Sequence, residues 1–154
     1  MSSRLDHEKL DVYQLELQFV GWATDLMVEI LDSPIARGRR IAETSDHLDR
    51  ASLSALFNTA EGNGRRPMKQ RARFFDDARG SAMECAACLD SYVAKKVVSA
   101  ERIELGKDLL VRIVSILCKL VDRFSPSDHV CEKSEPYDFG TDSHSHDSTP
   151  EEST

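Results

Sequence analysis

Apolar side chains recur at intervals of three and four residues along most of the first 124 positions, which is the period of an amphipathic helix. One stripe comprises Val12, Leu15, Phe19, Trp22, Ala23, Leu26 and Ile30. Another comprises Phe74, Ala78, Ala82, Cys85, Leu89 and Tyr92. No segment shows the period-two alternation of a half-buried strand. The pattern therefore predicts an all-α protein.

Helix-breaking residues divide this pattern into four predicted helices. The breakers are Pro34, Gly38, Gly62, Gly64, Pro67 and Pro126. The helices are expected at about 8–31, 40–61, 67–95 and 100–124. Gly62 and Gly64 suit the left-handed conformation that ends many helices. Pro67 suits the first helical position, and Ser99 is the expected N-cap of the fourth helix.

The start of the second helix is open, because Thr44 or Ser45 could cap a shorter one. Short connections favour antiparallel neighbours, so the expected fold is an up-down-up-down four-helix bundle. Residues 1–124 are long enough to bury a core as one domain.

The charge of the chain is concentrated at its end. Residues 125–154 hold eight acidic side chains against Lys133 alone, so this segment carries −7, the same as the net charge of the whole chain. It is rich in Ser, Asp and His and poor in apolar residues, which predicts a disordered acidic tail. Its histidines and cysteine offer no preformed geometry, so no metal site is predicted.

The neutral remainder contains two clusters of basic side chains. They are Arg37, Arg39 and Arg40, and then Arg65, Arg66, Lys69, Arg71 and Arg73. Arginine presents a planar fork that matches phosphate, so both clusters are candidate nucleic-acid-binding residues. No aromatic residues interleave with them as a stacking platform, which argues against base-specific reading. The alternative is that these cations pair with acidic neighbours such as Glu61, Asp76 or Asp77.

Two helices carry more apolar residues than one buried stripe requires. The first also holds Tyr13, Leu17, Val20, Met27 and Leu31, and the fourth is apolar around most of its circumference. Leaving a second apolar face in water is unfavourable, which predicts self-association. The alternative is that these residues pack beneath loops or the tail.

Two segments resemble a known family. They are Asp49-Arg50-Ala51-Ser52 with Asn58-Thr59-Ala60-Glu61-Gly62-Asn63-Gly64-Arg65, and Arg73-Phe74-Phe75 with Ala78-Arg79-Gly80-Ser81-Ala82-Met83-Glu84. Over about residues 8–124 the chain resembles the bacterial four-helix-bundle family that includes the intervening-sequence proteins encoded inside 23S ribosomal RNA genes. It is also similar to the accessory variability subunits of diversity-generating retroelements.

The resemblance implies a homo-oligomer, commonly a pentamer, without catalytic activity or cofactor. For the accessory subunits it also implies nucleic-acid binding, with RNA favoured here, and a reverse-transcriptase partner. The chain departs from the family pattern in its acidic tail and at several positions, including Ala55, Leu56 and Phe57, where branched apolar residues are usual. Pro67 and Gln70 stand where a serine–glutamate capping box is usual, and Thr59 stands where isoleucine is usual.

The motif residues are expected to be structural. They are Asn58, Glu61, Gly62, Gly64, Arg79 and Glu84. Glu61 and Glu84 could be paired catalytic carboxylates, but a pair with Arg73 or Arg79 that holds the hairpin is the favoured interpretation of Glu61. Asn58 is interpreted as a hydrogen-bonding lock between helices.

Catalytic or membrane functions find no support in the remaining sequence. The Cys85–Cys88 pair has the spacing of a redox or zinc motif, but it lies within an apolar helical stripe and predicts small core residues. The start of the chain lacks the apolar region of a signal peptide, and no apolar run is long enough to span a membrane. A non-enzymatic cytoplasmic protein is expected, and a protein-interaction module without nucleic-acid binding is the alternative.

Overall fold

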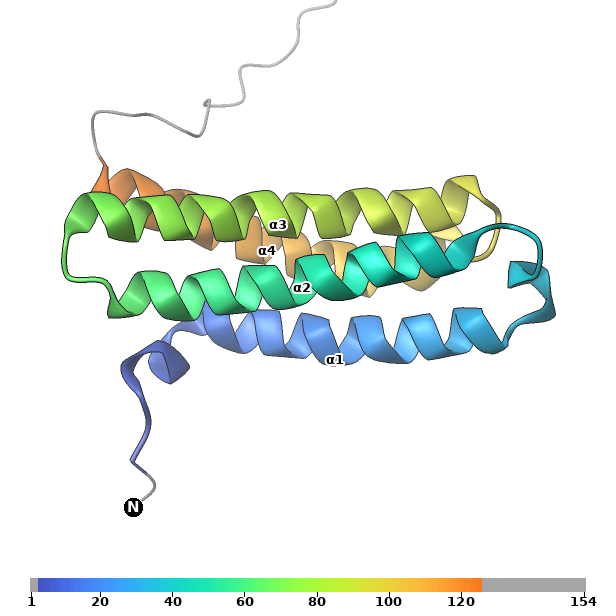
Figure 1. Ribbon diagram of the computed structural model, residues 1–154, viewed down its shortest axis with the longest axis horizontal. Helices are drawn as coiled ribbons and strands as arrows, with labels where there is room; N and C mark the ends of the chain where they lie inside the picture. Colours follow the sequence, from blue (N-terminus) through green and yellow to red (C-terminus); the bar gives the residue numbers. More distant parts are fainter. Residues whose placement is uncertain (1–2, 126–154) are drawn as a thin grey trace, which may run out of the picture.

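The computed structural model describes residues 3–125 of the chain. Its elements are η1 (Asp6–Lys9), α1 (Asp11–Asp32), η2 (Pro34–Ala36), α2 (Ile41–Gly64), α3 (Met68–Ala94) and α4 (Ala100–Phe124). The four α-helices form an antiparallel bundle in which each packs against its sequence neighbours and α1 packs against α4 (Figure 1). The described residues contain no strand, so the predicted all-α bundle is confirmed. The acidic tail beyond Ser125 lies outside the described residues.

Most helix boundaries fall close to those that the sequence predicts. The first helix begins later than expected, at Asp11, because the residues before it form the separate 3-10 turn η1. The second begins at Ile41, which excludes the shorter helix capped by Thr44 or Ser45. Ser99 is the N-cap of α4, and its side chain accepts a hydrogen bond from the Arg102 backbone N–H, as predicted. Pro67 lies one position earlier than expected, as the N-cap of α3.

The core runs along the axis between the four helices and contains most of the predicted stripes, but Phe75 is buried in it where the sequence predicts Phe74, which is only partly buried. Its largest fully buried side chains are Tyr92, Phe19, Phe75, Leu26, Ile30, Leu48, Leu89, Ile113 and Leu117. Small side chains such as Ala78 and Ala82 are also fully buried, which allows α2 and α3 to pack closely. The buried hydroxyl of Tyr92 lies 2.8 Å from Ser45 Oγ, so the polar end of this core side chain is satisfied.

Gly62 and Gly64 do not have the left-handed conformation that the sequence suggests. Both belong to α2, and Gly38 is the only described glycine with a positive φ. A Cβ on Gly62 would lie 2.9 Å from the Cβ of Phe74 and 3.2 Å from the Phe75 ring. Gly62 is therefore required for the close approach of α2 and α3 near their connection. The sequence predicts glycine here for a left-handed backbone conformation, whereas the structure requires it because a side chain would not fit.

A buried polar pair connects α1 and α2. Glu16 is 2% exposed and Thr59 is fully buried, and Thr59 Oγ1 donates a 2.7 Å hydrogen bond to Glu16 Oε1. No described group lies within hydrogen-bonding distance of Glu16 Oε2. Burial raises the pKa of Glu16 from 4.5 to about 8, against the opposing effect of the Thr59 hydrogen bond. The carboxyl is thus mostly protonated near neutral pH.

Candidate nucleic-acid interface

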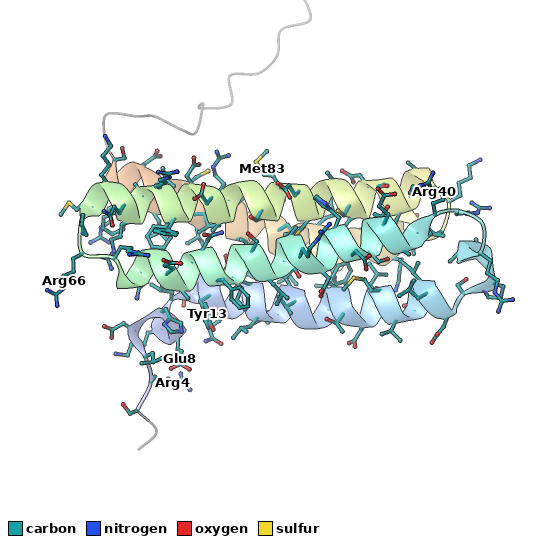
Figure 2. The ribbon with its side chains drawn as sticks, viewed as in Figure 1. Arg4, Glu8, Tyr13, Arg40, Arg66 and Met83 are labelled. Carbon is teal, nitrogen blue, oxygen red and sulfur yellow. The ribbon has the colours of Figure 1, made fainter. Side chains whose placement is uncertain are left out.

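The two predicted basic clusters lie at opposite ends of the bundle. The α1–α2 and α3–α4 connections share one end, whereas the α2–α3 connection shares the other with the end of α4 (Figure 1). The labelled Arg40 and Arg66 mark these two ends in Figure 2. The basic residues therefore form two candidate surfaces rather than one continuous patch. We call them the Arg40 end and the Arg66 end.

At the Arg66 end, two of the five predicted basic residues serve the local structure. Arg65 forms an ion pair with Glu61 one turn earlier and lies over the Phe74 ring, 4.9 Å from its centre. Arg71 donates hydrogen bonds to the backbone carbonyls of Gly62 at 3.3 Å and Asn63 at 2.6 Å. It thereby supplies a side-chain donor to carbonyl groups at the end of α2, where the Gly62 carbonyl also accepts the Arg65 backbone N–H at 3.2 Å.

The other three basic side chains are exposed at this end. They are Arg66, Lys69 and Arg73. Lys69 and Arg73 are four residues apart and therefore share one side of the first turns of α3, whereas Arg66 lies in the connection just before the helix. Figure 2 shows Arg66 projecting away from the bundle at the α2–α3 connection.

The start of α3 adds to this positive charge. Its N-cap Pro67 forms no side-chain cap, and the first turn contains no acidic residue. The first N–H groups of the helix and the positive end of its dipole therefore face outward without a local anion. This agrees with the missing capping box noted in the sequence. The combination favours a phosphate or carboxylate from outside the bundle.

Arg123 also lies at the Arg66 end, and the sequence interpretation missed it. Its guanidinium is 5.7 Å from the centre of the Phe124 ring, and the Arg71 guanidinium is 4.9 Å from the same centre. The Phe124 ring also packs against Phe75, with ring centroids 5.9 Å apart. An up-down-up-down topology places the end of the fourth helix beside the start of the third, so the predicted fold itself could have indicated this neighbour.

At the Arg40 end, more of the basic side chains form hydrogen bonds or ion pairs within the chain than at the Arg66 end. Arg39 Nη1 donates to the backbone carbonyl of Lys95 at 2.5 Å and to that of Lys96 at 3.3 Å. Arg40 is paired with Glu43 at 3.8 Å, and Lys95 donates to the Arg40 carbonyl at 3.2 Å. Arg37 remains exposed. Lys95 and Lys96, which the sequence interpretation also missed, join the three predicted arginines here.

The predicted partner of Glu61 was wrong. Glu61 pairs with Arg65, its neighbour on the same helix, and not with Arg73 or Arg79. Arg79 instead pairs with Asp76 on its own helix, at 2.8 Å. Both ion pairs are therefore local to one helix, where such contacts stabilise by only a few tenths of a kcal/mol, about 0.3–0.5.

Asn58 does not bond directly across the helices. Its side-chain amide donates to the Ser54 carbonyl at 2.9 Å, and Ser54 Oγ lies 3.0 Å from Ser81 Oγ on α3. The link from Asn58 to α3 thus runs through Ser54. Glu84 lies 3.1 Å from His47 Nε2, so the two motif carboxylates have different partners.

The CxxC pair has the predicted character of core side chains. Cys85 and Cys88 are free thiols and both are buried. Burial raises the pKa of Cys85 to about 12 and also raises that of Cys88. Such thiols lack the thiolate that redox and metal chemistry needs. Within residues 3–125, no group of three or more His, Cys, Asp or Glu side chains is placed to hold a metal ion.

An uncharged apolar surface runs along α1, and we call it the α1 flank. Its members Tyr13, Leu17, Val20, Gly21, Thr24, Val28 and Leu31 share one side of the helix. Leu17, Val28 and Leu31 are 41%, 56% and 54% exposed. Met27, which the sequence placed with this set, is buried in the core instead. The flank is about 27 Å long at 1.5 Å per residue.

The apolar excess of α4 is mostly covered within the single chain. Val114, Ile116 and Leu120 pack against the core, and Leu105 and Val111 remain exposed. The α1 flank is therefore the stronger candidate for self-association. None of the helices in residues 3–125 combines the length and the apolarity needed to cross a membrane.

Comparison with known proteins gives one finding. Residues 8–119 match the model of the 23S rRNA-intervening sequence protein family. No match was found among curated proteins or among solved structures. The matched region contains α1, α2 and α3 and most of α4, together with both halves of the motif that carries the resemblance. The chain therefore belongs to the 23S rRNA-intervening sequence protein family.

Proposed function

We propose that this protein is a non-enzymatic homo-oligomer that binds RNA through the Arg66 end. We further propose that the oligomer is a pentamer. The observation that supports RNA binding most strongly is the start of α3. There Arg66, Lys69 and Arg73 are exposed beside a helix N-terminus that has no cap and no acidic residue. Three such cations and a helix dipole form a site for polyanion phosphates rather than for one buried ligand. The family's association with 23S rRNA favours RNA over DNA.

Self-association would strengthen this site. In any cyclic ring the equivalent ends of all subunits lie at the same height along the axis. The exposed cations of every copy would then share one rim, and several weak phosphate contacts would act together. The uncharged α1 flank supports such an assembly, because isolated in water it would be a large exposed apolar surface.

The RNA proposal is tested by neutralising the exposed cations in the full chain. We expect the triple variant Arg66→Gln, Lys69→Gln, Arg73→Gln to bind a labelled 23S rRNA fragment about tenfold more weakly than the parent at about 100 mM salt, because each lost phosphate contact reduces counterion release. Fluorescence anisotropy measures the dissociation constants.

A matched control is available at the opposite end. The triple variant Arg37→Gln, Arg40→Gln, Lys96→Gln removes the same amount of charge from the Arg40 end, and we expect it to change the affinity less than threefold. If the two triple variants weaken binding equally, the Arg66 end is not the binding site.

Self-association is tested on the α1 flank. The double variant Leu17→Glu, Val28→Glu places two charges on this surface, and we expect it to sediment as the single 17.3 kDa chain. The parent is expected at roughly five times that mass by sedimentation equilibrium. The control variant Leu105→Glu, Val111→Glu alters two α4 side chains that are 59% and 64% exposed and should remain assembled. A parent that sediments as one chain would contradict the proposal.

The second candidate function is a protein-interaction module without nucleic-acid binding. The observation that favours it is the same α1 flank, to which a different protein could bind in place of a second copy of this chain. Absence of RNA binding in a chain that remains oligomeric or captures a partner through the flank would support it. The resemblance to retroelement accessory subunits implies a reverse transcriptase as partner. Such a partner would be an addition to the RNA-binding proposal and not an alternative to it.

A further inference from the structure

We infer that the acidic segment that follows Ser125 docks on the Arg66 end of its own chain and competes there with nucleic acid. This inference rests on the proposed function for the competition, but the docking contact stands independently of it. The proposed occupant is residues 126–154, and the proposed surface is the groove between the start of α3 and the end of α4.

The groove has the size and the chemistry for a carboxylate-bearing segment. Its volume is about 360 Å³, and it is lined by Lys69, Gln70, Ala72, Arg73, Asp76, Val121 and Ser125. Lys69 and Arg73 supply two cations one helical turn apart, at the uncapped start of α3. Asp76 is the only acidic side chain in this lining, and its carboxylate is already paired with Arg79 at 2.8 Å.

The occupant is complementary in charge. The segment 126–154 carries eight acidic side chains against Lys133, whereas Arg66, Lys69 and Arg73 at the Arg66 end are exposed cations. Individual surface ion pairs stabilise weakly, by roughly 0.2–1 kcal/mol each. Several of them on one tethered segment act together, as they do in multivalent binding.

The covalent connection brings the segment to this end and not to the other. Ser125 itself lines the groove, so the chain leaves the bundle at the proposed docking surface. Asp128 is three residues further on, a span of about 10 Å when extended, and Glu132 and Glu135 follow within about 35 Å. A short tether gives an effective concentration in the millimolar range, which suits weak ionic contacts. The Arg40 end lies a full helix length away.

Docking would make the tail a competitor for the same cations that bind RNA. Carboxylates and phosphates both favour guanidinium groups and helix N-termini. An RNA strand must therefore displace the tail before it contacts Lys69 and Arg73. Non-specific, weakly bound polyanions would be excluded more effectively than a ligand that contacts several subunits at once.

Two full-length variants with equal charge change test the inference. The proximal variant is Asp128→Asn, Glu132→Gln, Glu135→Gln, and the distal variant is Asp147→Asn, Glu151→Gln, Glu152→Gln. We expect the proximal variant to bind a labelled random-sequence RNA about five- to tenfold more tightly than the parent at about 50 mM salt. The distal variant should change the affinity less than twofold, because its acidic groups lie more than twenty residues from the groove.

A second measurement follows docking without RNA. Carbodiimide couples a lysine amine to a carboxylate in direct contact, and peptide mass spectrometry identifies the joined residues. We expect Lys69 to be joined to Asp128, Glu132 or Glu135 in the parent at low salt, and this product to be lost at about 1 M salt. Lys95 and Lys96 serve as internal controls and should not be joined to the tail.

The outcomes separate this inference from the proposed function. If RNA binds but the proximal and distal variants behave alike and Lys69 is not joined to the tail, the docking inference is wrong. If no variant binds RNA while Lys69 is joined to the proximal acidic residues, the tail docks and RNA binding is wrong. Coupling of the tail to Lys95 or Lys96 as often as to Lys69 would also overturn docking at this groove.

Discussion

Glu16→Gln is expected to stabilise the protein at alkaline pH, by about 3 kcal/mol at pH 9, and to change its stability by no more than about 1 kcal/mol near pH 5. In the parent, Glu16 is buried with Oε2 unpartnered among the described groups, and its pKa is raised by burial from 4.5 to about 8. Glutamine is nearly isosteric and remains neutral, although its amide still lacks a full set of partners.

The sign of the pH effect follows from the direction of this shift. Between pH 4.5 and about 8 the folded chain retains the Glu16 proton, whereas the unfolded chain has released it. The folded state binds more protons in this window, so stability from this group is fully present below pH 4.5 and falls as the pH rises. A shift of this size corresponds to roughly 5 kcal/mol over the whole window.

Urea unfolding of parent and variant from pH 5 to pH 9 measures this effect. The difference in their free energies of unfolding should grow with pH and become constant above about pH 8. Glu29→Gln, on the same helix, is the control, because hydrogen bonding to Arg102 lowers the pKa of this exposed carboxyl. Its difference from the parent should not change between pH 6 and pH 9. Parallel stability curves for parent and Glu16→Gln would contradict the role assigned to Glu16.

Gly106→Ala is expected to lower the free energy of unfolding by about 2 kcal/mol, because α1 and α4 approach too closely at this point for a methyl group. A Cβ on Gly106 would lie 2.1 Å and 2.2 Å from two ring atoms of Trp22. The ring would have to leave this position and its contact with Phe19, where the ring centroids are 5.8 Å apart.

Two readouts check this prediction. Trp22 is the single tryptophan of the chain, so its fluorescence should shift to longer wavelength as the ring becomes more hydrated. Gly80→Ala, inside α3 and outside the α1 flank, is the matched control, since no atom lies within 4 Å of a Cβ at that position. The control should gain about 0.5–1 kcal/mol through helix propensity. If both alanine variants gain stability and the Trp22 emission is unchanged, the close contact is not maintained in solution.

The helices were predictable from the sequence because their cause is local. The three- and four-residue spacing of apolar positions depends only on neighbours along the chain, and Ser99 caps α4 through a contact with Arg102 three residues on. Glu16 was not among the predicted core residues, although the helical period places it on the same face as Val12, Phe19 and Ala23. Its hydrogen bond to Thr59 was not predictable, because it joins residues 43 positions apart.

The glycines show the same distinction. Glycine near a helix end suggests a left-handed residue, and that interpretation of Gly62 was wrong because the requirement comes from Phe74 and Phe75 on the next helix. Gly106 lies inside α4, six residues after its first residue, where the sequence gives no reason for glycine. Its reason is the ring of Trp22, 84 positions earlier, which becomes a neighbour only in the folded bundle.

The basic residues were identified by the sequence, but their roles were not. Five cations at 65–73 look equivalent in a charge pattern. The structure separates Arg65 and Arg71, which contact Glu61, the α2 carbonyls and aromatic rings, from Arg66, Lys69 and Arg73, which are exposed and form no ion pair within the described residues. This separation depends on which side chains form hydrogen bonds with the backbone carbonyl groups at the end of a helix, and only the folded structure defines those bonds. Arg123 joins the same end through the topology of the bundle.

The salt dependence of RNA affinity tests the central claim most directly. Dissociation constants of the parent and of Arg66→Gln, Lys69→Gln, Arg73→Gln are measured from about 50 to 300 mM salt, and the logarithm of affinity is plotted against the logarithm of salt concentration. If these three side chains contact phosphates, the triple variant should have a slope smaller in magnitude by roughly 2–3. Equal slopes, or a parent that does not bind RNA at any salt concentration, would contradict the claim.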